Sequence, residues 1–210
     1  MSLDATRDYY ERYWTPGTET PPDLDPLTKD RINVFLRQGA PHQGRVLDAG
    51  CGGGRSTALL AAAGYQVTGI DISAAALRRA KANVSSAGLV MGGVDSSLPF
   101  ANDSFDVVFS SEVIEHLVDV NRALAEMRRV LRPSGKIFLS TPYHGRLKNL
   151  LLALRGFDQH FDPAGPHIRF FSLNSLTVML DRNGFRVRGH FCMGRFWPIW
   201  MNMLVWAEKV

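Results

Sequence analysis

The sequence is poor in cysteine and contains no long hydrophobic run. Among 210 residues only Cys51 and Cys192 are cysteines, and Cys51 lies in a glycine-rich stretch, so we expect no structural disulfide. Two unpaired thiols fit a reducing, cytoplasmic compartment. No apolar run reaches the ~18 residues that a membrane span requires, and the N-terminus, MSLDATRDYYERYW, is charged. We therefore expect neither a membrane span nor a secretion signal.

A strong excess of charge of one sign is also absent. The formal net charge is +4, and the basic residues are spread along the chain. Two short basic clusters are interpreted as solvated helix faces rather than as a nucleic-acid surface: Arg78, Arg79 and Lys81, and Arg128, Arg129 and Arg132. An apolar content of 45% is enough for a sizeable core, so residues 1–210 are predicted to form one domain.

The most informative stretch is RVLDAGCGGGRS, residues 45–56. The apolar residues Val46 and Leu47 lead into Asp48, small residues fill positions 49–54, and a helix-like segment follows over 56–63. Glycines permit a tight turn and let a ligand approach the bare backbone. A strand, a glycine turn and a helix in this order are typical of a nucleotide-binding α/β unit.

Two common phosphate-binding patterns do not fit this turn. The dinucleotide pattern G-x-G-x-x-G needs a final glycine where Arg55 or Thr57 stands, and no Lys-Ser or Lys-Thr follows the glycines. Instead, Asp48 precedes a G-x-G-x-G pattern made by Gly50, Gly52 and Gly54. A carboxylate beside the turn would repel a pyrophosphate. It suits a cationic or amine-bearing ligand.

This pattern resembles motif I of the class I S-adenosylmethionine (SAM) methyltransferases, whose turn contacts the methionine and ribose parts of SAM. The resemblance covers about residues 44–190 and implies SAM as cofactor. It implies these cofactor-binding residues: Asp48, Gly50, Cys51, Gly52, Gly54, Asp71, Ile72, Asp95, Ser96, Ser111 and Tyr9.

Two of these acids stand at the ends of expected strands. Asp71 follows the expected strand Gln66–Ile70, where a carboxylate can accept hydrogen bonds from both ribose hydroxyls. Its alternative role is to cap the next helix, which Ser73 could do instead. Asp95 follows the expected strand Leu89–Val94 and in the resembled family would accept from the adenine amino group; the alternative is an ordinary Asx turn.

Alternating segments continue to the end of the chain. Strands are expected at 104–110, 136–140, 185–192 and within 196–208, with helices at 73–86, 119–131 and 172–183. With the resemblance, this predicts an α/β fold: a Rossmann-like seven-stranded, mostly parallel sheet with an antiparallel last strand and helices on both faces. Residues 1–38 are expected to form N-terminal cap helices, at 4–14 and 27–38, and the irregular segment 143–170 a substrate lid.

A possible catalytic group follows the fourth strand in the segment SEVIEH. Glu112, Glu115 and His116 have the spacing i, i+3 and i+4, so in a helix they would share one face. With His167 from 143–170 they are candidate ligands for Mg²⁺ or Mn²⁺. The alternatives are that Glu112 only supports the cofactor loop and that His116 only caps a helix. His167 or His116 is also the candidate base that takes a proton from an oxygen acceptor.

The segment resembles two groups of methyltransferases. Ubiquinone-pathway O-methyltransferases carry E-x-x-E-H here, which implies a small-molecule acceptor, with oxygen as the expected atom. Small-RNA 2′-O-methyltransferases carry a similar metal set, and residues 140–142 and 167–170 echo them, but Tyr143 departs from their pattern. A metal-dependent RNA 2′-O-methyltransferase and a non-catalytic SAM-binding module are therefore the alternatives, and a non-methylating SAM enzyme such as an aminopropyl transferase is another.

Aromatic residues and methionines gather near the C-terminus, in FWPIWMNMLVWAE at 196–208. We expect this stretch to belong to the core. If exposed, it would form a surface for peripheral membrane association, through about 191–206, or for dimer formation.

Overall fold

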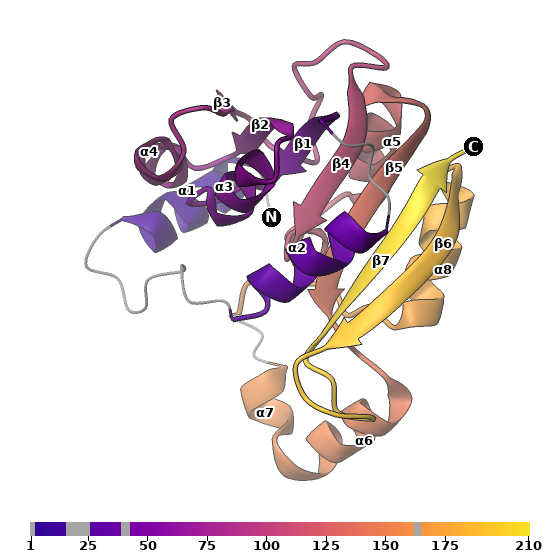
Figure 1. Ribbon diagram of the computed structural model, residues 1–210. Helices are drawn as coiled ribbons and strands as arrows, with labels where there is room; N and C mark the ends of the chain where they lie inside the picture. The colour runs from indigo at the N-terminus through magenta and orange to yellow at the C-terminus, as the bar shows by residue number, and fades with distance from the viewer. Residues whose placement is uncertain (1–2, 16–25, 39–42, 162–164) are drawn as a thin grey trace.

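The computed structural model describes residues 3–15, 26–38, 43–161 and 165–210, so most of the stretch between the two expected N-terminal helices lies outside the described residues. Its centre is a seven-stranded sheet of order β3-β2-β1-β4-β5-β7-β6 (Figure 1). The strands are β1 Arg45–Ala49, β2 Gln66–Asp71, β3 Gly88–Met91, β4 Phe105–Ser111, β5 Leu131–Pro142, β6 Phe185–Met193 and β7 Asn202–Lys209. Strand β7 runs antiparallel to both β5 and β6, and the other pairings are parallel. The predicted mostly parallel sheet with an antiparallel last strand is confirmed.

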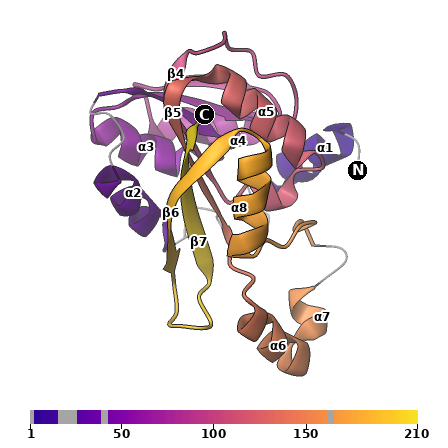
Figure 2. The same ribbon diagram turned by 90° about the vertical axis from the view of Figure 1, so that its right-hand side faces the viewer.

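Helices cover both faces of the sheet. They are α1 Leu3–Trp14, α2 Thr28–Arg37, α3 Arg55–Ala62, α4 Ala74–Asn83, α5 Val120–Val130, α6 Arg146–Arg155, α7 Phe157–His160 and α8 Leu173–Arg182. Figure 2 shows α2 and α3 on one side of the sheet and α5 and α8 on the other. Each side has its own buried cluster. Phe35 of α2 packs against Phe138 with ring centroids 4.7 Å apart, and on the opposite side Leu124 and Leu176 are buried.

The strand order places a ligand crevice between β1 and β4. The chain winds outward from β1 through β2 to β3, and then returns to β4 on the other side of β1. Helices on the two sides of such a switch point diverge, and the carboxyl ends of the parallel strands face the opening. Asp48, Asp71 and Ser111 therefore stand at one edge of the sheet, although 23 residues or more separate each from the next.

The end of α5 differs from expectation. We expected the helix to run to 131 and the strand to begin at Lys136, but β5 already begins at Leu131. The pairing with β4 shifts from Phe105–Leu131 to Val107–Lys136, so Pro133 and its neighbours form a bulge within the strand. The bulge keeps a turn-like sequence inside the sheet.

Two other elements are shorter than expected. Strand β3 ends at Met91 rather than at Val94, because Gly92 and Gly93 follow and β3 is an edge strand with one pairing partner. Helix α4 ends at Asn83 rather than at 86, because the next residue, Val84, takes an extended conformation. Over the described residues, no helix is long and apolar enough to cross a bilayer.

Arg129, which was expected on a solvated helix face, is partly exposed but also makes structural hydrogen bonds. Its guanidinium bonds the Glu126 carboxylate and donates to the carbonyl oxygens of Leu98 and Phe100, at 2.9 and 2.8 Å. Glu126 in turn accepts from the Leu98 backbone N–H at 2.8 Å. Arg129 therefore ties α5 to the loop that follows Asp95.

The segment 143–170 is not irregular as expected, because helices α6 and α7 occupy much of it. Both lie beyond the lower end of the sheet in Figures 1 and 2. The expectation of a core position for 196–201 was also wrong. The side chains of Phe196 and Trp197 are 72% and 66% exposed, and only the part from Asn202 onward, in β7, is buried in the sheet.

Candidate active site

A cavity of about 540 Å³ opens at the carboxyl ends of β1, β2 and β4. Most residues of the predicted cofactor set line it: Tyr9, Asp48, Gly50, Cys51, Gly52, Asp71, Ile72, Asp95 and Ser111. Gly54 and Ser96 are not among the lining residues. A Cβ on Gly54 would lie 2.9 Å from the Cβ of Ala80, so Gly54 is where α3 meets α4. The Ser96 hydroxyl donates to the Gly93 carbonyl at 2.7 Å and so shapes the loop around Asp95.

Hydrogen bonds to β2 hold the glycine turn in place. The N–H groups of Gly50 and Cys51 donate to the Ile70 carbonyl at 2.8 and 3.0 Å. The Asp71 carboxylate accepts from the Gly52 N–H at 2.8 Å and from the Ser73 N–H at 2.9 Å. Gly50 and Gly52 both have positive φ, 80° and 51°, which side chains with a Cβ rarely adopt. The capping role for the next helix falls to Ser73, whose hydroxyl accepts from the Ala76 N–H.

Asp48 lies beneath the turn and is almost wholly buried. Its carboxylate accepts from the Thr57 hydroxyl at 2.6 Å. Burial raises the pKa of Asp48 to about 7, an effect that Thr57 partly offsets and the nearby Asp71 carboxylate increases. Burial also raises the pKa of Asp71. Two buried acids at the floor of one cavity would both gain from a cationic or hydrogen-bond-donating ligand.

Helix α1 forms the roof of the cavity. Tyr9, Tyr10, Tyr13 and Trp14 all line it, and the Trp14 ring lies so close to the turn that a Cβ on Gly52 would meet it at 2.7 Å. The Glu11 carboxylate fastens the roof to α4, because it accepts from the Ser73 hydroxyl at 2.8 Å and from the Ala75 N–H at 3.1 Å. A carboxylate at the N-terminus of a helix is stabilised there by unpaired N–H groups.

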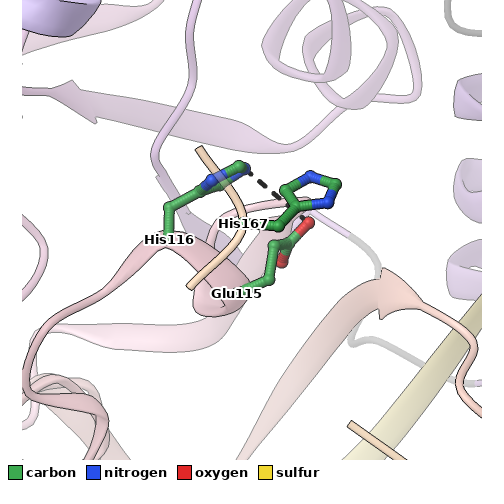
Figure 3. Close-up of side chains that lie close together, drawn as sticks. All are labelled: Glu115, His116 and His167. Carbon is green, nitrogen blue, oxygen red and sulfur yellow. Dashed lines mark ion pairs between the residues drawn. The ribbon is translucent and has the colours of Figure 1, made fainter. Parts of the chain in front are cut away.

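Three ionisable side chains meet on the cavity wall: Glu115, His116 and His167 (Figure 3). One ligand atom from each lies within 4.8 Å of the others. The Glu115 side chain is 1% exposed, and among the described residues no well-formed hydrogen bond reaches either of its carboxylate oxygens. The buried Thr141 hydroxyl nearby lowers the pKa of Glu115 slightly, against the larger effect of burial. The Nε2 atom of His116 lies 3.8 Å from Oε1 of Glu115. Unpartnered buried carboxylate oxygens are costly and uncommon, so this group is a candidate site of function.

Burial shifts the pKa values of this group in opposite directions. It raises the pKa of Glu115 well above its ordinary value, and the charge of Glu112 raises it further. It lowers the pKa of His116 to about 4 and also lowers that of His167. His116 is therefore neutral near pH 7. Since its Nδ1 lies 2.9 Å from the Pro166 carbonyl, we assign the proton to Nδ1, which leaves the Nε2 lone pair free.

Glu112 does not share a helix face with Glu115 and His116, so that expectation was wrong. The segment forms only a single 3₁₀ turn, η2 Ile114–His116, and Glu112 precedes it with a φ of +57°. The Glu112 carboxylate accepts from the Ser140 hydroxyl at 2.8 Å and from the Asn202 amide at 2.7 Å, and lies 3.6 Å from the Arg31 guanidinium. These partners hold Glu112 out of the three-residue group.

Backbone hydrogen bonds bring His167 into the site. The N–H groups of Ile168 and Arg169 both donate to the Glu115 carbonyl at 3.1 Å, and the Arg169 guanidinium donates to the Leu117 carbonyl at 2.8 Å. The segment after α7 is thereby fastened to η2, and His167 lies beside His116 with ring centroids 4.8 Å apart.

Sequence reasoning missed Arg31 and Asn202, which also line the cavity. Arg31 is 2% exposed and its Nε donates to the Asn202 side-chain oxygen at 3.3 Å. One signal was available for Arg31, because it stands four residues before the buried Phe35 and therefore on the apolar face of α2. No comparable signal marks Asn202, at the start of β7.

The cavity can accommodate a nucleoside with a charged tail, and the three-residue group can accommodate a divalent cation. The glycine backbone and the two buried acids suit the former. For the latter, the buried Glu115 carboxylate and the neutral imidazole of His116 are suitable donors. Comparisons with known proteins bear on the first of these assignments.

A methyltransferase domain family matches residues 47–139. A ubiquinone biosynthesis O-methyltransferase of Ralstonia nicotianae is 33% identical over 174 residues, which cover 79% of this chain and 71% of the relative. A malonyl-(acyl-carrier protein) O-methyltransferase of Erwinia pyrifoliae is 36% identical over 129 residues, covering 61% of this chain and 47% of the relative. One chain of the complex between the Haloferax volcanii Trm112 methyltransferase activator and a methyltransferase superposes with a TM-score of 0.75 at 18% identity, covering 95% of this chain and 97% of that one. The last likeness concerns the fold alone.

Proposed function

The chain belongs to the class I SAM-dependent methyltransferases, and from that premise we propose that it transfers the SAM methyl group to an oxygen atom of a small-molecule acceptor. The observation that carries this proposal is the group of Glu115, His116 and His167, which adds proton-accepting side chains to the wall of the cofactor cavity. An oxygen acceptor must lose a proton, whereas the sulfonium already activates the methyl group. The names of the Ralstonia and Erwinia relatives, both O-methyltransferases, support the same acceptor atom.

We assign the glycine turn and the acids around it to SAM. Asp71, which already fixes the Gly52 backbone, would accept from the ribose hydroxyls, and Asp95 would accept from the adenine amino group. Asp48 and the backbone of residues 50–52 would face the methionine part. Helix α1 would cover the cofactor, and Pro166 and His167 would border the acceptor, so that both exclude water from the transfer.

His167 and His116 are the proposed bases. His116 keeps a free Nε2 lone pair near pH 7, and the His167 ring lies beside the His116 ring. The same two imidazoles with Glu115 would hold a divalent cation, which when bound lowers the pKa of a coordinated hydroxyl. Two nitrogen ligands favour Mn²⁺ over Mg²⁺, because Mg²⁺ prefers oxygen ligands.

Methyl transfer from ¹³C-methyl SAM to a panel of phenols, carboxylic acids, amines and thiols tests the function. We expect products whose methyl carbon has the NMR shift of an O-methyl group. Methylation of nitrogen, sulfur or carbon would contradict the acceptor atom. Tight SAM binding without turnover on any acceptor would instead favour the non-catalytic module. The relatives named above give the RNA 2′-O-methyltransferase alternative no support.

Removal of divalent cations tests the metal assignment separately. After dialysis against a chelator, we expect kcat to fall at least tenfold and to recover on addition of Mn²⁺, because Glu115 then regains its partner. Addition of Ca²⁺ serves as the control, since it prefers an all-oxygen shell. Full activity in the presence of the chelator would refute the metal and leave the histidines as bases.

A further inference from the structure

Helix α1, the roof of the cavity, brings a tyrosine to the part of the cavity around Glu115, His116 and His167, which we call the acceptor half. Tyr10 lines the cavity, and its ring meets the His116 ring edge-on with centroids 5.9 Å apart. The sequence pointed to Tyr9 as a cofactor contact and gave Tyr10 no role. Tyr10 nevertheless lies where the roof meets the proposed bases.

Neighbouring rings hold the Tyr10 ring in place. The Tyr9 and Tyr13 rings both meet it edge-on, with centroids 5.1 and 6.3 Å away. Helix α1 is itself fastened to α4 through Glu11, the next residue along the chain. A side chain that is packed in this way presents its polar end in a defined direction, as a group that positions a substrate must.

The Tyr10 hydroxyl forms no hydrogen bond with any residue that the structure describes. A phenol hydroxyl in a buried position usually has a partner, and phenylalanine would supply the ring alone. Burial raises the pKa of Tyr10, and the charges of Tyr9, Glu115 and Asp71 raise it further, so the hydroxyl lies within electrostatic reach of both acids. It is protonated near pH 7, as even an exposed phenol is. Tyr10 is therefore an available hydrogen-bond donor between the two acids.

The charges around the cavity create a need for such a donor. Among the described residues, five acids line the cavity against two arginines, and Glu112 of the five stands beside the acceptor half. An acceptor oxygen that has lost its proton is an anion, and ionised carboxylates nearby raise its free energy. The Nε2 atom of His116 carries a lone pair and can donate only after it has taken a proton. A neutral phenol that already points at the developing charge lowers this cost, as the donors of an oxyanion hole do.

We propose that the Tyr10 hydroxyl donates a hydrogen bond to the acceptor oxygen while that oxygen is deprotonated and methylated, which makes Tyr10 a catalytic residue. This role rests on the proposed transfer to oxygen. The acceptor proton passes to His116 or His167, a bond forms between the acceptor oxygen and the methyl carbon, and the electron pair of the broken carbon–sulfur bond stays on sulfur. Tyr10 keeps its own proton throughout. Helix α1 therefore binds the acceptor as well as covering the cofactor.

Replacement of Tyr10 by phenylalanine tests this role, because phenylalanine keeps the ring beside His116 and removes only the hydroxyl. With the oxygen acceptors found among the phenols and carboxylic acids, we expect kcat to fall by a factor of about 10–100. The affinity for SAM, measured by calorimetry, should stay within about a factor of two of the parent's. The matched control is Tyr65→Phe, which removes a hydroxyl from a ring packed on Phe35 before the start of β2 and should retain full activity.

A titration of 4-nitrophenol gives a second readout that needs no turnover. The anion of this probe is yellow, and no methyl group can be transferred in a complex with S-adenosylhomocysteine. A donor that holds the anion lowers the pKa of the bound probe. We expect that pKa to be higher by about one pH unit in the complex of Tyr10→Phe than in the complexes of the parent and of Tyr65→Phe, which means that the variant holds the anion about tenfold more weakly.

The two readouts separate the role of Tyr10 from the proposed function. If the parent methylates no oxygen acceptor, the proposed function fails, while the bound probe still shows whether Tyr10 holds an oxygen anion. The role of Tyr10 is overturned if the probe does not bind the parent complex, or if it titrates alike in the parent and in Tyr10→Phe. It is also overturned if Tyr10→Phe loses SAM affinity by the same factor as kcat, because Tyr10 would then only be part of the roof over the cofactor.

Discussion

Replacement of Glu115 by glutamine is expected to lower kcat/KM for methyl transfer at least a hundredfold. The substitution keeps the size of the side chain but removes the carboxylate that lies against His116 in the cavity wall. Loss of a group that orients a base or holds a cation commonly costs a factor of ~10²–10⁴. The matched control is Asp181→Asn, on the exposed face of α8, which also removes one carboxylate and should retain full activity.

The same substitution should not weaken the fold. The folded-state pKa of Glu115 lies above its unfolded value, so the folded chain holds the proton more tightly and loses stability as pH rises between the two values. Glutamine does not titrate. In chelator-containing buffer we therefore expect the parent and the variant to have equal unfolding free energies near pH 4. Between the unfolded and the folded pKa of Glu115, the unfolding free energy of the variant should exceed that of the parent by up to ~1.4 kcal/mol more for each pH unit. Denaturant titrations at several pH values measure this difference. Lower stability of the variant in alkaline buffer would mean that the carboxylate has a stabilising partner.

Replacement of Asp71 by asparagine should weaken SAM binding ten- to a hundredfold, or ~1.4–2.8 kcal/mol. Asparagine keeps one accepting oxygen for the turn but loses the charge and the second oxygen that the ribose hydroxyls would use. Alanine should weaken binding further. It should also lower the unfolding free energy by about 2–4 kcal/mol, since the N–H groups of Gly52 and Ser73 lose their acceptors.

Isothermal titration calorimetry with SAM and with S-adenosylhomocysteine separates these effects. Asp181→Asn is again the control. Affinity of Asp71→Asn equal to that of the parent would show that Asp71 only supports the glycine turn. A lower SAM affinity of Asp71→Asn, with an unchanged thermal unfolding temperature, would favour direct contact between Asp71 and the cofactor.

The cofactor half of the site was largely predictable because its residues follow the ends of parallel strands. Asp48 is the last residue but one of β1 and Asp71 is the last of β2, and the carboxyl ends of neighbouring parallel strands meet at one edge. The left-handed conformations of Gly50 and Gly52 were likewise predictable, because glycine is the residue that adopts them most readily. Local sequence therefore determined both the position and the conformation of this half.

The acceptor half was less predictable because long-range contacts determine it. The spacing of Glu112, Glu115 and His116 suggested one helix face, yet bonds from Ser140 and Asn202, 28 and 90 residues away, hold Glu112 elsewhere. The bulge in β5 arises in the same way, because pairing with β4 overrides a sequence typical of a turn. The residue types of segment 143–170 could mark His167 as a candidate ligand or base, but not which backbone groups would hold it.

The side chain and the backbone of Glu115 have separate roles in the site. Its carboxylate faces the cavity, whereas its backbone carbonyl accepts the N–H groups of Ile168 and Arg169 and so positions His167. Any amino acid at position 115 retains that carbonyl. Substitutions at position 115 can therefore change the charge in the cavity while His167 keeps its place. The charge of the site and the position of His167 can be separated by mutation, although one residue determines both.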